Sequence, residues 1–216
     1  MKPNVAHLIR FCNETSYMTC NDIEALFQRL GRLVHASQQK RGNGTAWDYK
    51  FPDGETHHYI IRNVKSLSDV EDSVSNLLIW IWNSKDYLKD RLLSKGLDPQ
   101  YVERFIDENH HLSVCGDLAN QLKHGRAKKS RSGKFPKLDV AGFSIPQSAI
   151  QTLTFRAFEV DVDVGNPDDV EFRIPILDSK GVEFGEVFEY VTAAITGLET
   201  LWENIESVSV THGARK

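Results

Sequence analysis

The sequence has little cysteine and no long apolar run. Its three cysteines, Cys12, Cys20 and Cys115, form no C-x-x-C pair. An odd, unpaired set argues against a disulfide framework, and three thiols are too few for a cysteine zinc site. The longest apolar run, Leu77–Trp82, is far too short to cross a bilayer. We therefore expect a cytoplasmic protein that makes no membrane contact.

The sequence also lacks the usual signatures of nucleotide, cofactor and metal sites. It has no dinucleotide-binding fingerprint and no Gly-x-Ser-x-Gly turn, and no apolar leader follows Lys2. Residues 126–138, called the basic segment below, do not complete a phosphate-loop motif, because Phe135 stands where the motif requires Ser or Thr. We predict no cofactor and no metal site. The net charge of −4 predicts solubility and little else.

Apolar residues recur at helical spacing in several segments, which predicts amphipathic helices. These helices are expected to begin near Asp22, Ser68, Pro99, Leu112 and Val187. Ser68-x-x-Glu71 is a capping-box pattern, and Gly125 is placed to end the fourth helix. The pattern also allows a short helix at Val5–Cys12, and residues 208–216 resemble a frayed tail.

The helix that begins near Ser68 is apolar on most sides. Val74, Leu77 and Ile81 lie on one face, whereas Trp80 and Trp82 lie elsewhere around the helix. A helix of this kind is either the central helix of a bundle or also supports a subunit interface. The sequence leaves both alternatives open.

Strand patterns lie between the helices. Residues 47–51 alternate and precede a Pro-Asp-Gly turn, after which residues 58–61 can return as a hairpin. Residues 150–164 alternate as one strand, residues 170–177 are expected to return, and residues 182–184 can add a third strand. These patterns predict an antiparallel β-meander.

The predicted fold is therefore α+β, an antiparallel helix bundle with an inserted antiparallel β-meander. Residues 1–125 are expected to form a helical region with a small hairpin near 47–62. Residues 126–184 supply a basic loop and the β-meander insertion, and residues 185–216 return to the bundle as the C-terminal helix. We expect one compact domain overall.

The candidate catalytic residues lie on the helix that ends before Gly125. Helical rotation places Asp117, Asn120 and His124 in one polar row, opposite an apolar stripe that ends at Leu122. A histidine at a helix C-terminus favours the protonated imidazole. Such a group, with an amide beside it, can act as a general acid or base in RNA cleavage. A solvated polar face explains the same residues without a site.

A helical bundle with the pattern Asn120-x-x-Lys123-His124 resembles the HEPN superfamily. Many HEPN members cut RNA without metal in defence and toxin–antitoxin systems, so the resemblance implies a ribonuclease that works at a dimer cleft. The HEPN signature is Arg, four to six residues, then His. The segment before His124 has no Arg at that offset, whereas Arg29 and His35 fit the spacing on another helix.

Two charged segments are candidate binding surfaces. The basic segment after the candidate catalytic helix can neutralise phosphates without reading sequence. Its candidate contacts to nucleic acid are Lys123, Arg126, Lys128, Lys129, Arg131 and Lys134. Residues 159–189 are acidic, and a strand would place Glu159, Asp161 and Asp163 on one face. That face is either solvent-exposed or docks the basic loop.

Two functions remain compatible with the sequence. In the first, the protein is a non-catalytic, oligomeric intracellular interaction protein. It uses its charged segments and the apolar face that carries Trp80 and Trp82, and a second copy is among its expected partners. In the second, it is a HEPN-like metal-independent ribonuclease, or an RNA-binding effector of a defence or toxin–antitoxin system. RNA or another phosphate-bearing polymer would then be the partner, and His124 the acid or base.

Overall fold

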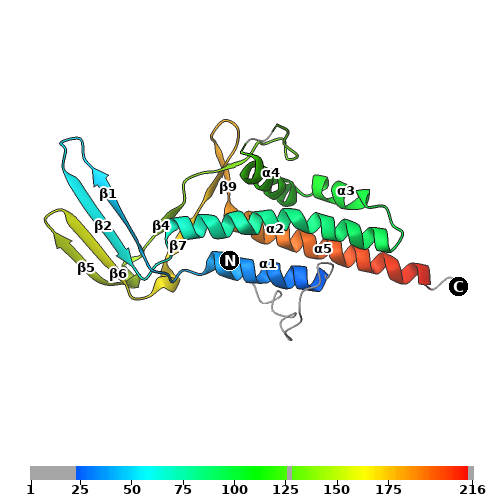
Figure 1. The fold of residues 1–216 in the computed structure, drawn as a ribbon, viewed down its shortest axis with the longest axis horizontal. Helices are drawn as coiled ribbons and strands as arrows, with labels where there is room; N and C mark the ends of the chain where they lie inside the picture. Colours follow the sequence, from blue (N-terminus) through cyan, green and yellow to red (C-terminus); the bar gives the residue numbers. More distant parts are fainter. Residues whose placement is uncertain (1–22, 126–127, 214–216) are drawn as a thin grey trace.

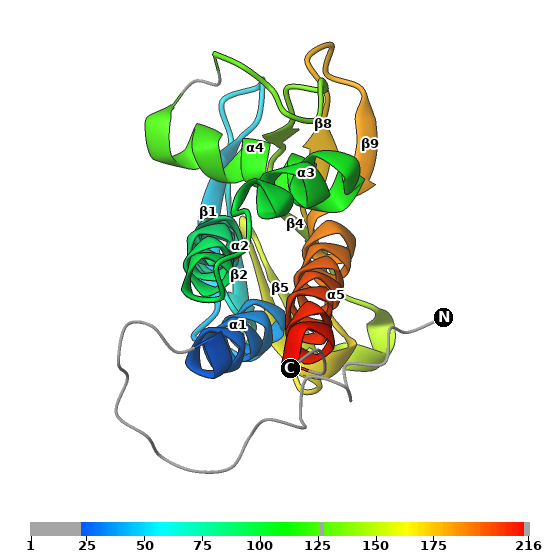
Figure 2. The ribbon, with the colours of Figure 1, turned by 90° about the vertical axis from the view of Figure 1, so that its right-hand side faces the viewer.

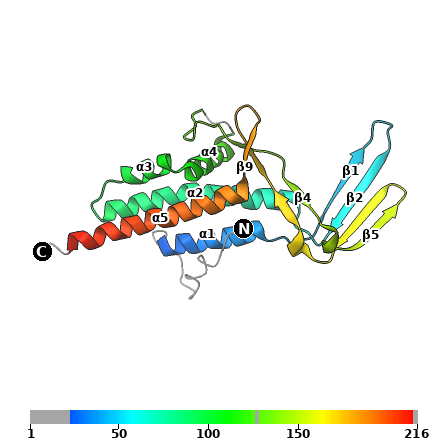
Figure 3. The ribbon, with the colours of Figure 1, turned by 180° about the vertical axis from the view of Figure 1, so that it is seen from behind.

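The computed structural model describes residues 23–125 and 128–213, with side chains described to residue 208. The fold is α+β, as the sequence predicts. In the described part of the chain, an elongated helix bundle carries a four-stranded sheet that projects from one end (Figures 1 and 3). No helix among the described residues is both long enough and apolar enough to cross a membrane.

The helix α2 (Leu67–Ser94) is the central helix of the bundle. Both α1 (Ile23–Gln38) and α5 (Val187–Gly213) pack along it, as does α4 (His110–His124), and α3 (Gln100–Glu108) lies beside α4 (Figures 1 and 2). Apolar side chains of α2 are fully buried at helical spacing, and they form one core with the facing helices. The prediction of a central helix is therefore confirmed.

Both tryptophans of α2 are covered by groups of the same chain. The Arg29 Cζ atom lies 4.0 Å from the centroid of the Trp80 ring, and the Arg131 Cζ atom lies 5.2 Å from that of Trp82. The Trp82 ring also lies close to Gly116, where an added Cβ would be 2.5 Å from it. Arginine side chains therefore stack on the Trp80 and Trp82 rings, which the sequence predicts to form an apolar docking face.

The helix ends agree with the sequence in part. The N-cap of α2 is Ser66, whose side chain accepts the N–H of Asp69 at 3.1 Å, so the helix begins before the predicted Ser68. Gly125 ends α4 in the left-handed conformation, at φ 71°, as predicted. The helix α5 extends to Gly213, so the prediction of a frayed tail from residue 208 is wrong for that stretch. The predicted helix at 5–12 lies outside the described residues.

The projecting sheet, called the arm below, joins two hairpins from distant parts of the chain. One hairpin is β1 (Thr45–Lys50) with β2 (Thr56–Arg62), and the other is β5 (Ile150–Arg156) with β6 (Glu159–Val164). The strand order is β1-β2-β6-β5, and β2 pairs with β6 in parallel. The predicted single strand over 150–164 is wrong, because the alternation continues on both sides of a tight turn at 157–158.

The remaining strands are short and connect the arm to the bundle. The strand β7 (Glu171–Arg173) pairs with β4 (Gly142–Ser144), and β8 (Pro175–Leu177) lies between β3 (Lys137–Leu138) and β9 (Glu183–Glu186). The predicted return of residues 170–177 against residues 150–164 is therefore wrong, and the insertion is not one antiparallel meander. A small second core holds the base of the arm; its buried members are Ile61, Val64, Ala149, Val164 and Val170.

Candidate functional site

The carboxylate of Asp117 lies inside the protein rather than on an exposed row. Asp117 is 3% exposed and is covered by the basic segment that follows α4. Its oxygens accept the hydroxyls of Ser130 and Ser132 at 2.6 and 2.7 Å. They also accept the backbone N–H groups of Arg131 and Ser132 at 2.8 and 2.9 Å. Asp117 therefore does not belong to a solvated polar face, one of the two alternatives that the sequence allows, because the segment folds back over this side of α4.

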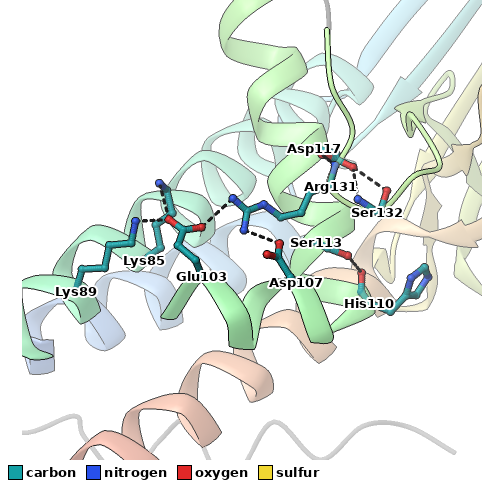
Figure 4. A network of polar contacts seen from close by, with 9 residues as sticks. All are labelled: Lys85, Lys89, Glu103, Asp107, His110, Ser113, Asp117, Arg131 and Ser132. Carbon is teal, nitrogen blue, oxygen red and sulfur yellow. Dashed lines mark hydrogen bonds and ion pairs between the residues drawn. The ribbon is translucent and has the colours of Figure 1, made fainter. Parts of the chain in front are cut away.

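The backbone of Arg131 is bound to Asp117, and its side chain extends to α3. Its guanidinium lies 2.8 Å from Asp107 and 2.8 Å from Glu103 (Figure 4). Lys89 and Lys85 approach the same Glu103 carboxylate from α2, Lys85 at 3.8 Å. The basic segment thus docks on α3 and α4 and not on the acidic strand. Glu159 and Asp161 on that strand pair instead with arginines of the arm.

Glu103 is the common acidic partner of this network (Figure 4). Burial raises the pKa of its carboxyl, but the cations of Lys89 and Arg131 outweigh burial, so the pKa lies below its ordinary value. The carboxylate therefore stays ionised and holds the cations in place. Three elements, α2, α3 and the basic segment, are joined at this one side chain.

Of the residues predicted to contact nucleic acid, some bind groups of the same chain and others are exposed. Arg131 is bound to carboxylates, and Lys134 Nζ lies 5.7 Å from the centroid of the Phe184 ring. Lys123 donates to the side-chain oxygen of Asn83 at 2.6 Å. Lys128 and Lys129 are exposed near the end of α4. Arg126 lies outside the described residues.

The predicted acid or base, His124, is the last residue of α4 and is exposed. Asn120 is half-buried one turn earlier, and no hydrogen bond joins these two side chains in the described structure. Leu122, which the sequence assigned to the apolar stripe, is exposed. The catalytic roles of His124, Asn120 and Asp117 remain predictions, and the structure does not bring the three side chains together.

Sequence reasoning missed the contact of the exposed His110 and half-buried His111 with Tyr190 of α5. His110 Nε2 lies 3.1 Å from the Tyr190 hydroxyl, and the His111 ring packs against Tyr190. Burial and the neighbouring His110 lower the pKa of His111, and burial raises the pKa of the Cys115 thiol to about 12. Both shifts favour neutral forms, which makes Cys115 a poor nucleophile. Among the described residues, no group of three His, Cys, Asp or Glu side chains is placed to hold a metal ion.

A cavity of about 730 Å³ lies between the end of α1, the β4–β7 pair and the start of α5. Burial raises the pKa of Glu186, which lines it and which accepts the N–H of Phe188 at 2.8 Å. The two cations at its wall are engaged as well: Arg173 pairs with Glu183, and Lys40 donates to a backbone carbonyl. Glu186, Arg173 and Lys40 thus already have partners within the described chain.

Sequence reasoning also missed the apolar face of the arm. The register places the odd-numbered residues of β1, β2 and β5 on one face with the even-numbered residues of β6. We call this surface the aromatic face; its members are Trp47, Tyr49, His57, Tyr59, Leu153, Phe155, Phe158 and Val160. Its rings contact one another in two groups: Trp47 stacks on Tyr59, and His57 contacts Phe158.

The aromatic face is uncovered by the rest of the described chain. The arm extends beyond the bundle in Figures 1 and 3, and the helices lie near its base. Trp47, Tyr49, Leu153, Phe155 and Phe158 are between 43% and 71% exposed. The alternation of these side chains is visible in the sequence, and it was the signal that could have identified the face.

No family model, curated protein or solved structure matches this chain.

Proposed function

We propose that the protein is a non-catalytic interaction protein of the cytoplasm and that the aromatic face is its docking surface. The exposure of five large apolar side chains on one face carries the proposal. With about 200 Å² for a large side chain, they present on the order of 500 Å² of apolar surface. A patch of this size is comparable to the largest apolar patch on a typical monomer, and such patches are often functional.

The arrangement of the rings supports the same function. Trp47 and Tyr59 are stacked, and Phe51 contacts both Tyr49 and His57. Rings held by their neighbours lose little conformational freedom when a partner binds. At its base the face continues into the small core around Ile61, so the surface is supported by packed side chains.

Photo-crosslinking in the cells that naturally produce the protein tests the function. We expect a benzophenone amino acid at Phe155 to give a discrete adduct, because this side chain is 71% exposed on the face. The matched control places the same amino acid at Thr154, the neighbouring residue on the opposite face. Leu153→Lys should abolish the adduct at 155. Equal labelling at the two positions, or none, contradicts the function.

A second candidate function is RNA binding, with HEPN-like cleavage. Lys128 and Lys129 favour it, because both are exposed and come shortly after His124 in the sequence. We expect affinity for single-stranded RNA that falls with salt and that is reduced by K128E with K129E. Lys180→Glu, on an exposed turn elsewhere, is the control.

Cleavage needs its own test. If RNA is cut, His124→Ala should abolish the activity while leaving the salt-dependent affinity in place. Cleavage that persists in His124→Ala contradicts the role of this residue. Binding that does not respond to salt contradicts the RNA function as a whole.

A further inference from the structure

We infer that the partner on the aromatic face is a second copy of this chain, packed sheet against sheet. The inference rests on the proposed function and names its partner. It follows from the absence of charged strand residues on the face, from the area of the face, and from the fact that a two-fold dimer brings two identical faces together.

The aromatic face carries no charge on its strands. The seven Asp, Glu, Lys and Arg residues of β1, β2, β5 and β6 all project from the opposite face. They are Asp48, Lys50, Arg62, Arg156, Glu159, Asp161 and Asp163. A partner with charged groups at its centre would bury them without compensation. The occupant must therefore present a flat, uncharged and apolar surface of its own.

This requirement excludes one alternative use of an aromatic sheet. Single-stranded nucleic acid stacks its bases on aromatic rings, but it also needs cations that follow the phosphates. Arg62 and Arg156, the arginines of the arm's strands, lie on the other face and pair with Asp161 and Glu159. The exposed Lys128 and Lys129 belong to the segment after α4, in the bundle and not in the arm.

A second copy supplies the required surface. In a two-fold dimer the same patch lies on both sides, so a face whose strands carry no Asp, Glu, Lys or Arg meets an identical face. Two sheets packed in this way lie about 10 Å apart, with their side chains interdigitated. The exposed rings of Trp47 and Phe155 would then be covered as they are in a β-sandwich.

The area of the face is sufficient for such a dimer. The five exposed side chains of two copies would together remove on the order of 1,000 Å² from water, which is about the lower limit for a specific interface. The half-buried Tyr59, His57 and Val160 add to that area. The face therefore matches a small apolar dimer interface and not a crystal-type contact.

Light scattering across a dilution series tests the inference. We expect the wild-type chain to have twice its monomer mass of 24.5 kDa at micromolar concentration. Leu153→Lys and Phe155→Lys should each give a monomer, because the lysine would be buried against apolar side chains. The control is Thr154→Lys, which places the same charge on the opposite face of the same strand and should remain a dimer.

Circular dichroism separates loss of the dimer from loss of the fold. A folded monomer in Leu153→Lys and Phe155→Lys, beside a dimeric Thr154→Lys, supports the inference. A wild-type monomer at micromolar concentration overturns it without any variant, as does a dimer that persists in both face variants. If the wild-type chain is a monomer but still forms an adduct at residue 155 with a partner of different mass, the proposed function stands. The partner is then not a second copy of the chain.

Discussion

Trp47 lies nearly parallel to Tyr59, with ring centroids 5.3 Å apart and an interplanar angle of 10°. The two residues are direct partners in the β1–β2 register. A cross-strand stack of this kind stabilises a hairpin and fixes the orientation of both rings. Because Trp47 remains exposed, the stack also displays an ordered apolar surface to solvent.

Asp117→Asn tests whether the buried carboxylate anchors the basic segment. An amide has one oxygen, so part of the donor set from Ser130, Arg131 and Ser132 would lose its acceptor. We expect the free energy of unfolding to fall by about 3 kcal/mol, since hydrogen bonds to charged groups are strong and unpaired donors are costly. Urea unfolding measures this change. Hydrogen exchange should rise at residues 130–135.

The matched control for this variant is Asp107→Asn. Asp107 has a side chain that is 57% exposed, and one ion pair to Arg131. An exposed ion pair contributes less than about 1 kcal/mol. Equal losses in the two variants would show that Asp117 has no special role in holding the segment.

Gly116→Ala and Gly31→Ala should have opposite effects. An added Cβ at Gly116 would lie 2.5 Å from the Trp82 ring, whereas at Gly31 nothing lies within 4 Å. We expect Gly116→Ala to lower the free energy of unfolding by about 1–3 kcal/mol through overpacking. Gly31→Ala should raise it by about 0.5–1 kcal/mol, because alanine favours the helix. Thermal unfolding of both variants measures the difference, and a stabilised Gly116→Ala contradicts this packing.

The helices were largely predictable from the sequence, whereas the environment of Asp117 was not. Apolar spacing identifies the buried side of α4 because the pattern is local. The same pattern assigns Asp117 to solvent. The donors that bury it come from residues 130–132, whose own sequence shows only charge and small polar side chains. A contact between a helix and a later irregular segment leaves no periodic signal.

The arm shows the same limit for strands. Alternation placed Trp47 and Tyr49 on one face, as the structure confirms. It could not show that β2 pairs with β6, because parallel pairing between distant hairpins is a tertiary feature. Alternation also predicts a face without saying whether anything covers it. For this reason the sequence does not identify the aromatic face as exposed, and its apolar pattern points to Trp80 and Trp82 instead.

Glu103→Gln should change how stability depends on pH. The pKa of Glu103 in the folded protein lies below its ordinary value of 4.5. A carboxyl with a depressed pKa adds stability above its unfolded pKa, and that contribution is lost as pH falls through the folded pKa. We expect the wild type to lose its advantage over Glu103→Gln as pH falls below 4.5. Urea unfolding over a pH series measures the difference, and a constant difference contradicts the proposed ionic network.

Hydroxyl-radical footprinting tests the central claim, that a partner occupies the aromatic face, most directly. The oxidation rate of Phe155 is compared between freshly lysed producing cells and the purified chain at high dilution. Leu93, which is 57% exposed on α2, is the internal reference in the same molecule. We expect Phe155 to be protected in the lysate, relative to Leu93, and to become reactive on dilution. Equal relative rates in the two samples would contradict the account, because they would mean that nothing covers the face.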